Sequence, residues 1–323
     1  MRYTRREFGK LAMGTLPAAA LLNQPFRAFA ATKPDSVING VHVSTITYSY
    51  RSMPDQSAEA ILRYVVNSGI SEIEFMGGPV EAYAGAPQVF RVPFGTKPNA
   101  EQQAKLREAA EQMRAWRTSV SMDRFKALRK MFNDAGVTIY AWKQLAPEMS
   151  DAEMEYVFNV AEALGNTHTT LELVDDAAQL KRIGAFAEKH KVYAAYHTHL
   201  QGSMTVFDQA FAVSKYNRAN VDLGHYVAAG GDPVQFLNKF HDRVASFHLK
   251  DRQTPAHGAG NLAWGKGDTP IREILQLVKK NKWTMPATIE LEYNVPAGSD
   301  AVKEVVKCLD YCKQALASST PSA

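Results

Sequence analysis

The sequence predicts an α/β fold in which eight parallel strands alternate with helices and close into a single-domain (β/α)8 barrel. From Val41 onward, apolar β-branched runs alternate with amphipathic stretches, a pattern typical of βαβ units. The length of 323 residues suits one such barrel without a second domain. Several of the runs end in polar residues, and barrels of this kind carry their active sites at the ends of their strands.

Helix signals separate the expected strands. Ser57 and Ser150 precede stretches with helical periodicity and are expected to be N-caps. The segment 77–98 contains glycines and several prolines, so we expect an irregular loop there on the active-site side. The expected strands are 41–47, 72–76, 137–142, 169–173, 192–197, 220–223, 245–249 and 287–291.

The first 30 residues have the pattern of an export signal. A pair of arginines at positions 5 and 6 precedes a modestly apolar stretch, and Ala-Phe-Ala at 28–30 has the form of a cleavage site. This resembles a twin-arginine signal, which predicts a periplasmic or secreted protein. The apolar stretch is short and interrupted by Gly14 and Pro17, so a permanent transmembrane helix is not expected. The predicted division is a signal peptide over 1–30 and a barrel domain over 31–323.

The basic character of the chain belongs to this N-terminal segment. The whole chain has a formal net charge of +4. Residues 1–30 hold five basic residues and one acidic residue, so the remainder is formally neutral. A neutral domain lacks the basic surface that nucleic-acid binding requires, and no nucleic-acid partner is expected.

Four of the predicted strands end in residue types that bind metal ions. Because side chains alternate along a strand, each of three ends presents two polar groups on one face. A buried carboxylate such as Asp222 is costly unless it is paired or bound to a metal. If these strands are neighbours in the barrel, their polar side chains converge at one rim of the barrel, and the sequence therefore predicts a divalent-metal site there. The ends are His197 with His199, Asp222 followed by His225, His248 with Lys250, and Glu290 with Glu292.

Alternation alone leaves the ligand on two of these strands open. Either His197 or His199 would bind the ion, with the other contacting substrate or supporting the ligand. Glu290 is favoured over Glu292 because it continues the strand. Further polar residues lie at the ends of neighbouring strands. Trp142 is expected in the wall of the pocket or in the core. We expect Glu172, Glu292 and Lys250 to be catalytic, and Glu74, Lys143, His199, His225 and Trp142 to contact substrate.

The strand-end sequences Tyr-His-Thr-His, Val-Asp-Leu-Gly-His, Phe-His-Leu-Lys-Asp-Arg and Ile-Glu-Leu-Glu-Tyr resemble those of the sugar phosphate isomerase/epimerase family, the xylose-isomerase-like TIM barrels. The resemblance covers about residues 38–316. It implies one divalent ion, Mn²⁺ first with Mg²⁺, Co²⁺ or Zn²⁺ as alternatives, held by His197, Asp222, His248 and Glu290. Many relatives have a glutamate where this chain has His197, which leaves His199 as another ligand and Glu172 as a replacement.

The resemblance also implies an activity. In this family a metal ion stabilises an enediolate while a carboxylate removes the proton beside a carbonyl, which gives isomerisation or epimerisation. Export favours a free sugar or keto-sugar over a sugar phosphate as the small-molecule carbohydrate substrate. One alternative is a lyase or hydratase that eliminates the aglycone of a 3-keto-glycoside. Another is a noncatalytic sugar-binding barrel. A homo-oligomer stays open.

Overall fold

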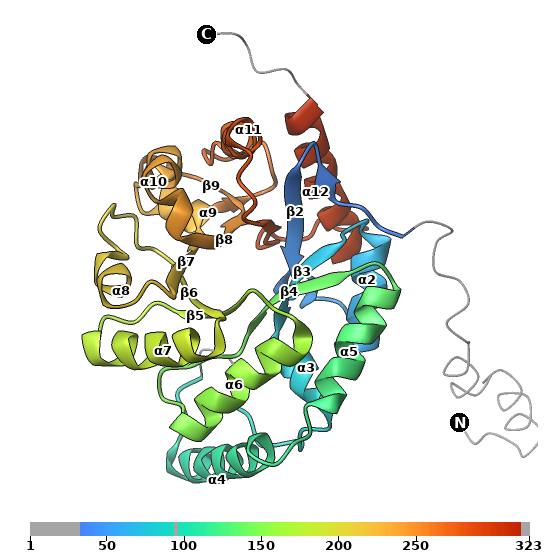
Figure 1. Cartoon of the computed structure of the whole chain (residues 1–323). Coiled ribbons are helices and arrows are strands. Elements are labelled where there is room, and N and C mark those ends of the chain that lie inside the picture. Colours follow the sequence, from blue (N-terminus) through green and yellow to red (C-terminus); the bar gives the residue numbers. More distant parts are fainter. Residues whose placement is uncertain (1–32, 94–95, 318–323) are drawn as a thin grey trace, which may run out of the picture. The chain divides into compact units, whose positions relative to one another are not determined.

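Eight strands pair side by side in a parallel ring, which confirms the predicted barrel (Figure 1). The structure, a computed structural model, describes residues 33–93 and 96–317. The expected signal peptide lies outside the described residues, so export stays a prediction. In ring order the strands are β2 (Val41–Ile46), β3 (Glu72–Met76), β4 (Thr138–Lys143), β5 (His168–Glu172), β6 (Tyr193–His197), β7 (Asn217–Asp222), β8 (Val244–Leu249) and β11 (Ala287–Ile289), and β11 pairs with β2 to close the ring.

The strand ends agree with the prediction to within one residue, except in two strands. Strand β7 begins at Asn217, three residues early, because that buried side chain donates to the carbonyl oxygens of Leu180 and Ala210. Strand β11 ends at Ile289, two residues early, so Glu290 follows the strand. The backbone nitrogen of Glu290 still donates to the Leu249 carbonyl oxygen, which keeps this residue against β8.

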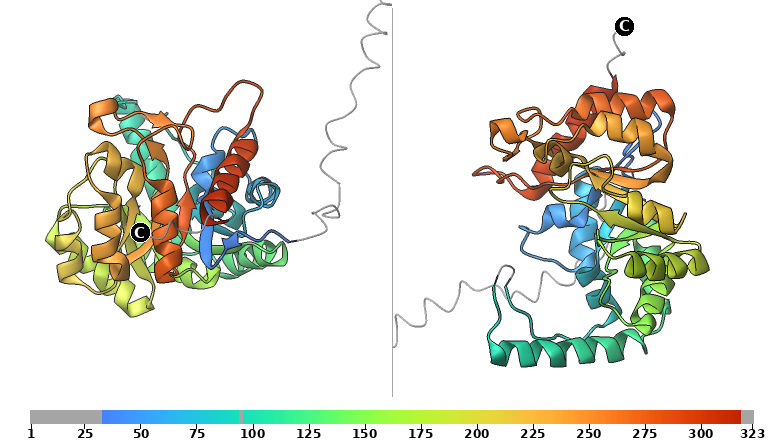
Figure 2. Two further views of the ribbon diagram at one scale, coloured as in Figure 1. Left: turned by 90° about the horizontal axis from the view of Figure 1, so that it is seen from above. Right: turned by 90° about the vertical axis from the view of Figure 1, so that its left-hand side faces the viewer.

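Helices lie outside the strand ring and cover it, as two further views show (Figure 2). Ser57 and Ser150 cap helices as predicted, and Ser150 forms a capping box with Glu153. Among the described residues, no helix combines the length and apolar character needed to cross a bilayer. The helices are α2 (Ala58–Asn67), α3 (Gly77–Ala84), α4 (Ala100–Arg117), α5 (Asp123–Asp134), α6 (Asp151–Leu164), α7 (Ala177–His190), α8 (Asp208–Val213), α9 (Leu223–Ala228), α10 (Pro233–Phe240), α11 (Ile271–Asn281) and α12 (Ala301–Ala317), with 3-10 turns η2 (Thr47–Tyr50), η3 (His241–Arg243) and η4 (Pro255–His257).

The expectation of an irregular loop over 77–98 was wrong in its first part. Helix α3 begins at Gly77, directly after β3, where an added Cβ would lie 1.7 Å from Gln144 Oε1. Glu81 in this helix is buried and accepts hydrogen bonds from Arg117 of α4 at 2.8 Å and from Tyr156 of α6 at 3.2 Å. These bonds fix the segment between two neighbouring helices.

Two short antiparallel pairs complete the fold. Strand β1 (Val37–Ile38) joins β2 through Asn39 and Gly40, whose φ angles of 51° and 84° suit a tight hairpin turn. Strands β9 (Asp251–Arg252) and β10 (Asn261–Leu262) pair in the long connection after β8. In that connection Asp251 Oδ2 accepts from the backbone nitrogens of Gly265, Lys266 and Gly267, which anchors the loop.

Candidate metal centre

Four side chains meet at the carboxyl ends of neighbouring strands. His197 ends β6, Asp222 ends β7, His248 lies near the end of β8 and Glu290 follows β11. All four residues are buried, and one ligand atom from each lies within 4.8 Å of the others. Strand pairing explains the convergence, because Asp222 is in register with His248 and parallel strands end at one rim. The sequence predicted this group of four.

The two oxygens of Asp222 have different surroundings. Oδ1 accepts a hydrogen bond from the backbone nitrogen of His225 at 2.7 Å and so caps helix α9. Oδ2 lies 2.9 Å from Lys250 Nζ but makes no hydrogen bond to the described part of the chain. Burial raises the pKa of Asp222 to about 6 despite the nearby lysine. A buried carboxylate oxygen whose nearest charged partner is an ammonium group lies in a place that suits a cation.

Lys250 brings the carboxylates of the site together. Its Nζ lies 2.9 Å from Asp222 Oδ2, 2.8 Å from Glu290 Oε2 and 2.6 Å from Glu292 Oε2. Gly224 makes this approach possible, since an added Cβ there would lie 2.2 Å from Lys250 Cγ. Burial alone would lower the pKa of Lys250, but the three carboxylates outweigh it and raise that pKa. The lysine is therefore a cation.

His248 lies between two carboxylates. Its Nδ1 is 3.0 Å from Glu290 Oε2, and its Nε2 is 2.7 Å from Glu74 Oε2. Burial disfavours the imidazolium, but Glu74 and Glu290 outweigh burial and raise the pKa of His248 to about 10. Glu74 is fully buried and also accepts from Thr170 Oγ1 at 2.6 Å. Glu74 therefore orients His248 through a hydrogen bond to Nε2. This corrects the prediction from the sequence that Glu74 contacts the substrate.

His197 has a different support. Its Nδ1 lies 2.8 Å from Asn220 Oδ1, so Nε2 is the nitrogen left for an ion. Burial lowers the pKa of His197 to about 3, which keeps the imidazole neutral as a metal ligand must be. The ring centroid of His197 lies 4.7 Å from that of His248. Two imidazoles and two carboxylates form a donor set that suits a divalent transition metal.

Three further predicted residues gather beside His197. Glu172 Oε1 lies 2.7 Å from Lys143 Nζ, and its Oε2 lies 2.9 Å from His199 Nε2. The side chains of Glu172 and His199 are about half exposed, with 52% and 56% accessible. The bond from Glu172 raises the pKa of His199, while burial opposes it. Glu172, His197 and His199 also form a second group with ligand atoms within 4.8 Å. Both histidines at the end of β6 therefore stay candidates for the metal ligand.

His225 and Trp142 lie in different environments. His225 Nε2 is 3.7 Å from Glu292 Oε2, and its Nδ1 contacts the Arg252 guanidinium. Burial and the Lys250 and Arg252 charges lower the pKa of His225 to about 2, so it is neutral. Trp142 is fully buried, and its ring packs against Tyr156 of α6, 6.1 Å between centroids. Alternation turns Trp142 to the helix layer, away from the side to which Lys143 points, which corrects its place among the substrate contacts.

Several residues of the site had not been singled out in the sequence. Asn220, Ser246 and His168 are fully buried polar side chains inside strands, and Arg252 follows β8. Polar residues at the inward positions of apolar strands were the available signal, because such groups are buried only when they are hydrogen-bonded.

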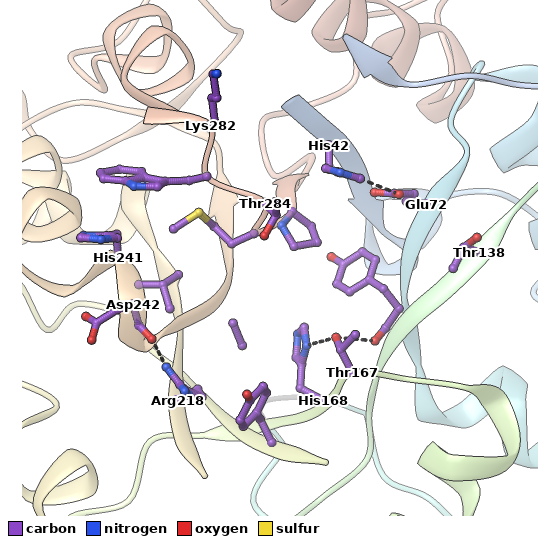
Figure 3. A pocket seen from close by; sticks show the side chains of 17 residues that line it. His42, Glu72, Thr138, Thr167, His168, Arg218, His241, Asp242, Lys282 and Thr284 are labelled. Carbon is purple, nitrogen blue, oxygen red and sulfur yellow. Dashed lines mark hydrogen bonds and ion pairs between the residues drawn. The ribbon is translucent and has the colours of Figure 1, made fainter. Parts of the chain in front are cut away.

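A cavity lies at the other mouth of the barrel. It has a volume of about 620 Å³ and is lined by residues at the beginnings of strands, including His42, Glu72, His168 and Arg218 (Figure 3). The metal candidates stand at the strand ends instead. Chemistry in parallel barrels takes place at the carboxyl ends of strands, so the cluster, and not the cavity, is the candidate active site.

The fold and the cluster together define a (β/α)8 barrel with a buried group of metal-binding side chains at the carboxyl ends of its strands. The family model of the xylose isomerase-like TIM barrel matches residues 80–312, and the chain belongs to this family.

Proteins similar to this chain include isomerases, epimerases and dehydratases. An inosose dehydratase of Clostridium tetani is 22% identical over 167 residues, or 45% of this chain and 55% of the relative. The chain thus spans about half the length of the curated relatives it matches. A sugar phosphate isomerase/epimerase from Parabacteroides distasonis is 16% identical, with a TM-score of 0.58 over 90% of this chain and 97% of that one. A 3-keto-D-glucoside 4-epimerase from E. coli is 8% identical, with a TM-score of 0.58 over 85% and 99%. At these identities, the similarity to the two solved structures shows a common fold with this chain.

Proposed function

We propose that this protein is a divalent-metal-dependent isomerase or epimerase that acts on a free sugar or keto-sugar. The observation that carries the proposal is the buried group His197, Asp222, His248 and Glu290, whose ligand atoms lie within 4.8 Å of one another. These four side chains would hold the ion, and Mn²⁺ suits their mixture of imidazole and carboxylate. When bound, the ion would polarise a carbonyl group and stabilise the negative charge that develops beside it.

Two carboxylates would move the protons. Glu172 lies on β5, next in ring order to the first ligand strand, and Glu292 follows β11, the last ligand strand. Each is paired with a proton donor, Glu172 with His199 at 2.9 Å and Glu292 with Lys250 at 2.6 Å. Removal of a proton by one pair and its return to the neighbouring carbon, with the hydroxyl proton moved from one oxygen to the other, would give isomerisation. Removal by one pair and return by the other would invert the carbon and give epimerisation.

Charge at the site favours a substrate without a phosphate. Lys143 is paired with Glu172, and Lys250 is paired with Asp222, Glu290 and Glu292. A phosphate would have to compete with these carboxylates for the two lysines, whereas neutral hydroxyl groups can hydrogen-bond to the pairs as they stand. The proposed export agrees with a free sugar.

A second candidate is a lyase or hydratase that acts on keto-glycosides or related cyclic ketones. The specific observation is His199, half exposed and with its pKa raised by Glu172, because an imidazolium at this place would protonate a leaving oxygen. The similarity to inosose dehydratases agrees with elimination. The same proton removal beside a carbonyl would serve both reactions, and only the fate of the neighbouring oxygen differs.

A screen of keto-sugars and keto-glycosides in D2O separates these reactions. Purified protein is first analysed for bound metal and then incubated with each compound, and the products are measured by mass spectrometry and NMR. An isomerase or epimerase would return products of unchanged formula with deuterium at the reacting carbon, whereas a lyase would release water or the aglycone.

Variants at the ligands complete the test. Asp222→Ala and His248→Ala should lose bound metal and turnover together while the barrel stays folded, as judged by circular dichroism. Full turnover in either variant, or in metal-free wild-type protein, would overturn the proposal. Sugar binding without turnover in the metal-loaded protein would instead identify a noncatalytic barrel.

A further inference from the structure

We propose that Asn220, backed by Ser246 and His168, is a positioning residue that fixes the tautomer of His197 and leaves its Nε2 ready to bind the ion. The inference rests on the proposed metal site. Its basis is a line of hydrogen bonds through the barrel interior, from the cluster at the strand ends to the cavity at the strand beginnings. Asn220, Ser246 and His168 are each fully buried, and His197 is 2% exposed.

The orientation of the Asn220 amide follows from its neighbour Glu74. The Glu74 carboxylate accepts from Thr170 Oγ1 at 2.6 Å and from His248 Nε2 at 2.7 Å. An ionised carboxylate only accepts hydrogen bonds, so the amide group that faces its Oε2 at 3.4 Å must be the Nδ2 of Asn220. The amide oxygen is thereby turned to His197.

This orientation decides where His197 carries its proton. Asn220 Oδ1 lies 2.8 Å from His197 Nδ1, and an amide oxygen only accepts. His197 must therefore donate from Nδ1, which leaves the lone pair on Nε2 for an ion. The same Glu74 receives the Nε2 proton of His248, so one buried carboxylate orients both histidines, one directly and the other through Asn220.

The hydrogen bonds continue in one direction beyond Asn220. Its Nδ2 donates to Ser246 Oγ at 2.7 Å, and Ser246 Oγ lies 2.9 Å from His168 Nε2. The other nitrogen of the same imidazole, His168 Nδ1, lies 2.8 Å from Thr167 Oγ1. Thr167 Oγ1 in turn donates to the Tyr140 carbonyl oxygen at 3.2 Å. Figure 3 shows the last two bonds at the edge of the cavity. Because the Thr167 hydroxyl donates to Tyr140, His168 must donate from Nδ1 to Thr167, and its Nε2 accepts from the Ser246 hydroxyl. Each of these side chains then has a hydrogen-bond partner.

A line of buried polar groups needs a reason, because apolar side chains would pack the same space without the risk of unpaired donors. Asn220 lies between His197 and Ser246 in strand register, next to the first on β6 and the second on β8. A leucine at position 220 would suit the barrel core, but it would allow His197 to hold its proton on Nε2. Support of this kind typically changes metal affinity 10- to 100-fold.

Mn²⁺ titration of the metal-stripped full chain tests the inference. Asn220→Leu should raise the dissociation constant for Mn²⁺ by about 10- to 100-fold. Ser246→Ala, one step further from His197, should weaken Mn²⁺ binding in the same direction by a smaller factor. The matched control is Ser44→Ala, because Ser44 is also a fully buried serine with two side-chain partners, the Tyr140 hydroxyl at 3.2 Å and Thr288 at 3.0 Å, and these bonds involve none of Asn220, Ser246 and His168.

The outcomes separate this inference from the metal site itself. Weaker Mn²⁺ binding in Asn220→Leu and Ser246→Ala with unchanged binding in Ser44→Ala supports it. Lower thermal stability in all three variants with wild-type Mn²⁺ affinity overturns it, because that is the result of a purely structural role. If Asn220→Leu does not fold, the pair Ser246→Ala and Ser44→Ala decides. Asp222→Ala serves as the reference, since wild-type Mn²⁺ affinity in that variant would refute the proposed function instead.

Discussion

Replacing Lys250 with methionine removes the cation around which three carboxylates are arranged. The Lys250 side chain is 3% exposed, and its Nζ lies within 2.9 Å of oxygens of Asp222, Glu290 and Glu292. Loss of one partner from a buried ion pair costs about 3–5 kcal/mol, because the remaining charge is buried without compensation. With an unfolding entropy of about 2.1 cal/mol/K per residue, a unit of roughly 290 residues would lose about 5–8 °C in Tm.

This loss of stability should depend on pH. In Lys250→Met, burial and mutual repulsion place the pKa values of the Asp222 and Glu290 carboxyls above those of the unfolded chain. A group with a raised pKa in the folded state contributes stability below its unfolded pKa and loses it as pH rises through the folded pKa. The difference from wild type should therefore be small near pH 4 and complete at neutral pH.

Thermal unfolding of chelator-treated protein across this pH range measures the effect. The control is Lys143→Met, which breaks the 2.7 Å pair with Glu172. Because Glu172 is half exposed, water solvates the carboxylate left behind, and the expected cost is below about 1 kcal/mol. A Tm for Lys250→Met equal to that of wild type at pH 7, or a deficit equal at every pH, would refute the reasoning.

Three further predictions concern metal binding, acid stability and the core. Mn²⁺ at about 100 times its dissociation constant should stabilise the wild-type protein by roughly 2.7 kcal/mol, and Asp222→Ala should show no such shift in Tm. Burial lowers the pKa of His168 from 6.5 to about 4, so the folded state should lose stability as pH falls between these values, and His168→Gln should flatten that part of a denaturant-midpoint profile. Trp142→Ala should cost about 3–5 kcal/mol in chemical unfolding with unchanged Mn²⁺ affinity, whereas weaker Mn²⁺ binding would place the indole at the site.

The sequence was sufficient for the barrel because the barrel depends on local pattern. Period-two alternation selects the inward residues, and parallel strands bring their carboxyl ends to one rim, which indicated a metal site but left the ligand on two strands open. The set of His197, Asp222, His248 and Glu290 was implied by the resemblance of the strand-end sequences to a known family. The same alternation would have excluded Trp142, since it precedes Lys143 in β4 and two adjacent residues face opposite sides.

Contacts across the barrel could not be predicted, because they do not depend on local sequence pattern. His168 on β5 meets Ser246 on β8 at 2.9 Å, and the two strands are separated by β6 and β7 in the ring. Such a contact depends on barrel diameter and strand stagger, neither of which alternation determines. The depth of Glu74 is a similar case, because its run indicates an inward carboxylate but not that this carboxylate bonds to His248 Nε2.

The charges of the site also bear on how an ion would bind. Four carboxylates, those of Glu74, Asp222, Glu290 and Glu292, lie around the Lys250 ammonium and around His248, which can bind an ion only as the neutral imidazole. The described site therefore has an excess of negative charge. An ion that binds Asp222 Oδ2 and Glu290 Oε2 competes with the lysine ammonium for the same two oxygens. Lys250→Met should therefore bind Mn²⁺ more tightly than wild type although it folds less stably, and saturating Mn²⁺ should restore its Tm by more than it raises that of wild type. Weaker Mn²⁺ binding in this variant would show that the ammonium and the ion do not share these oxygens.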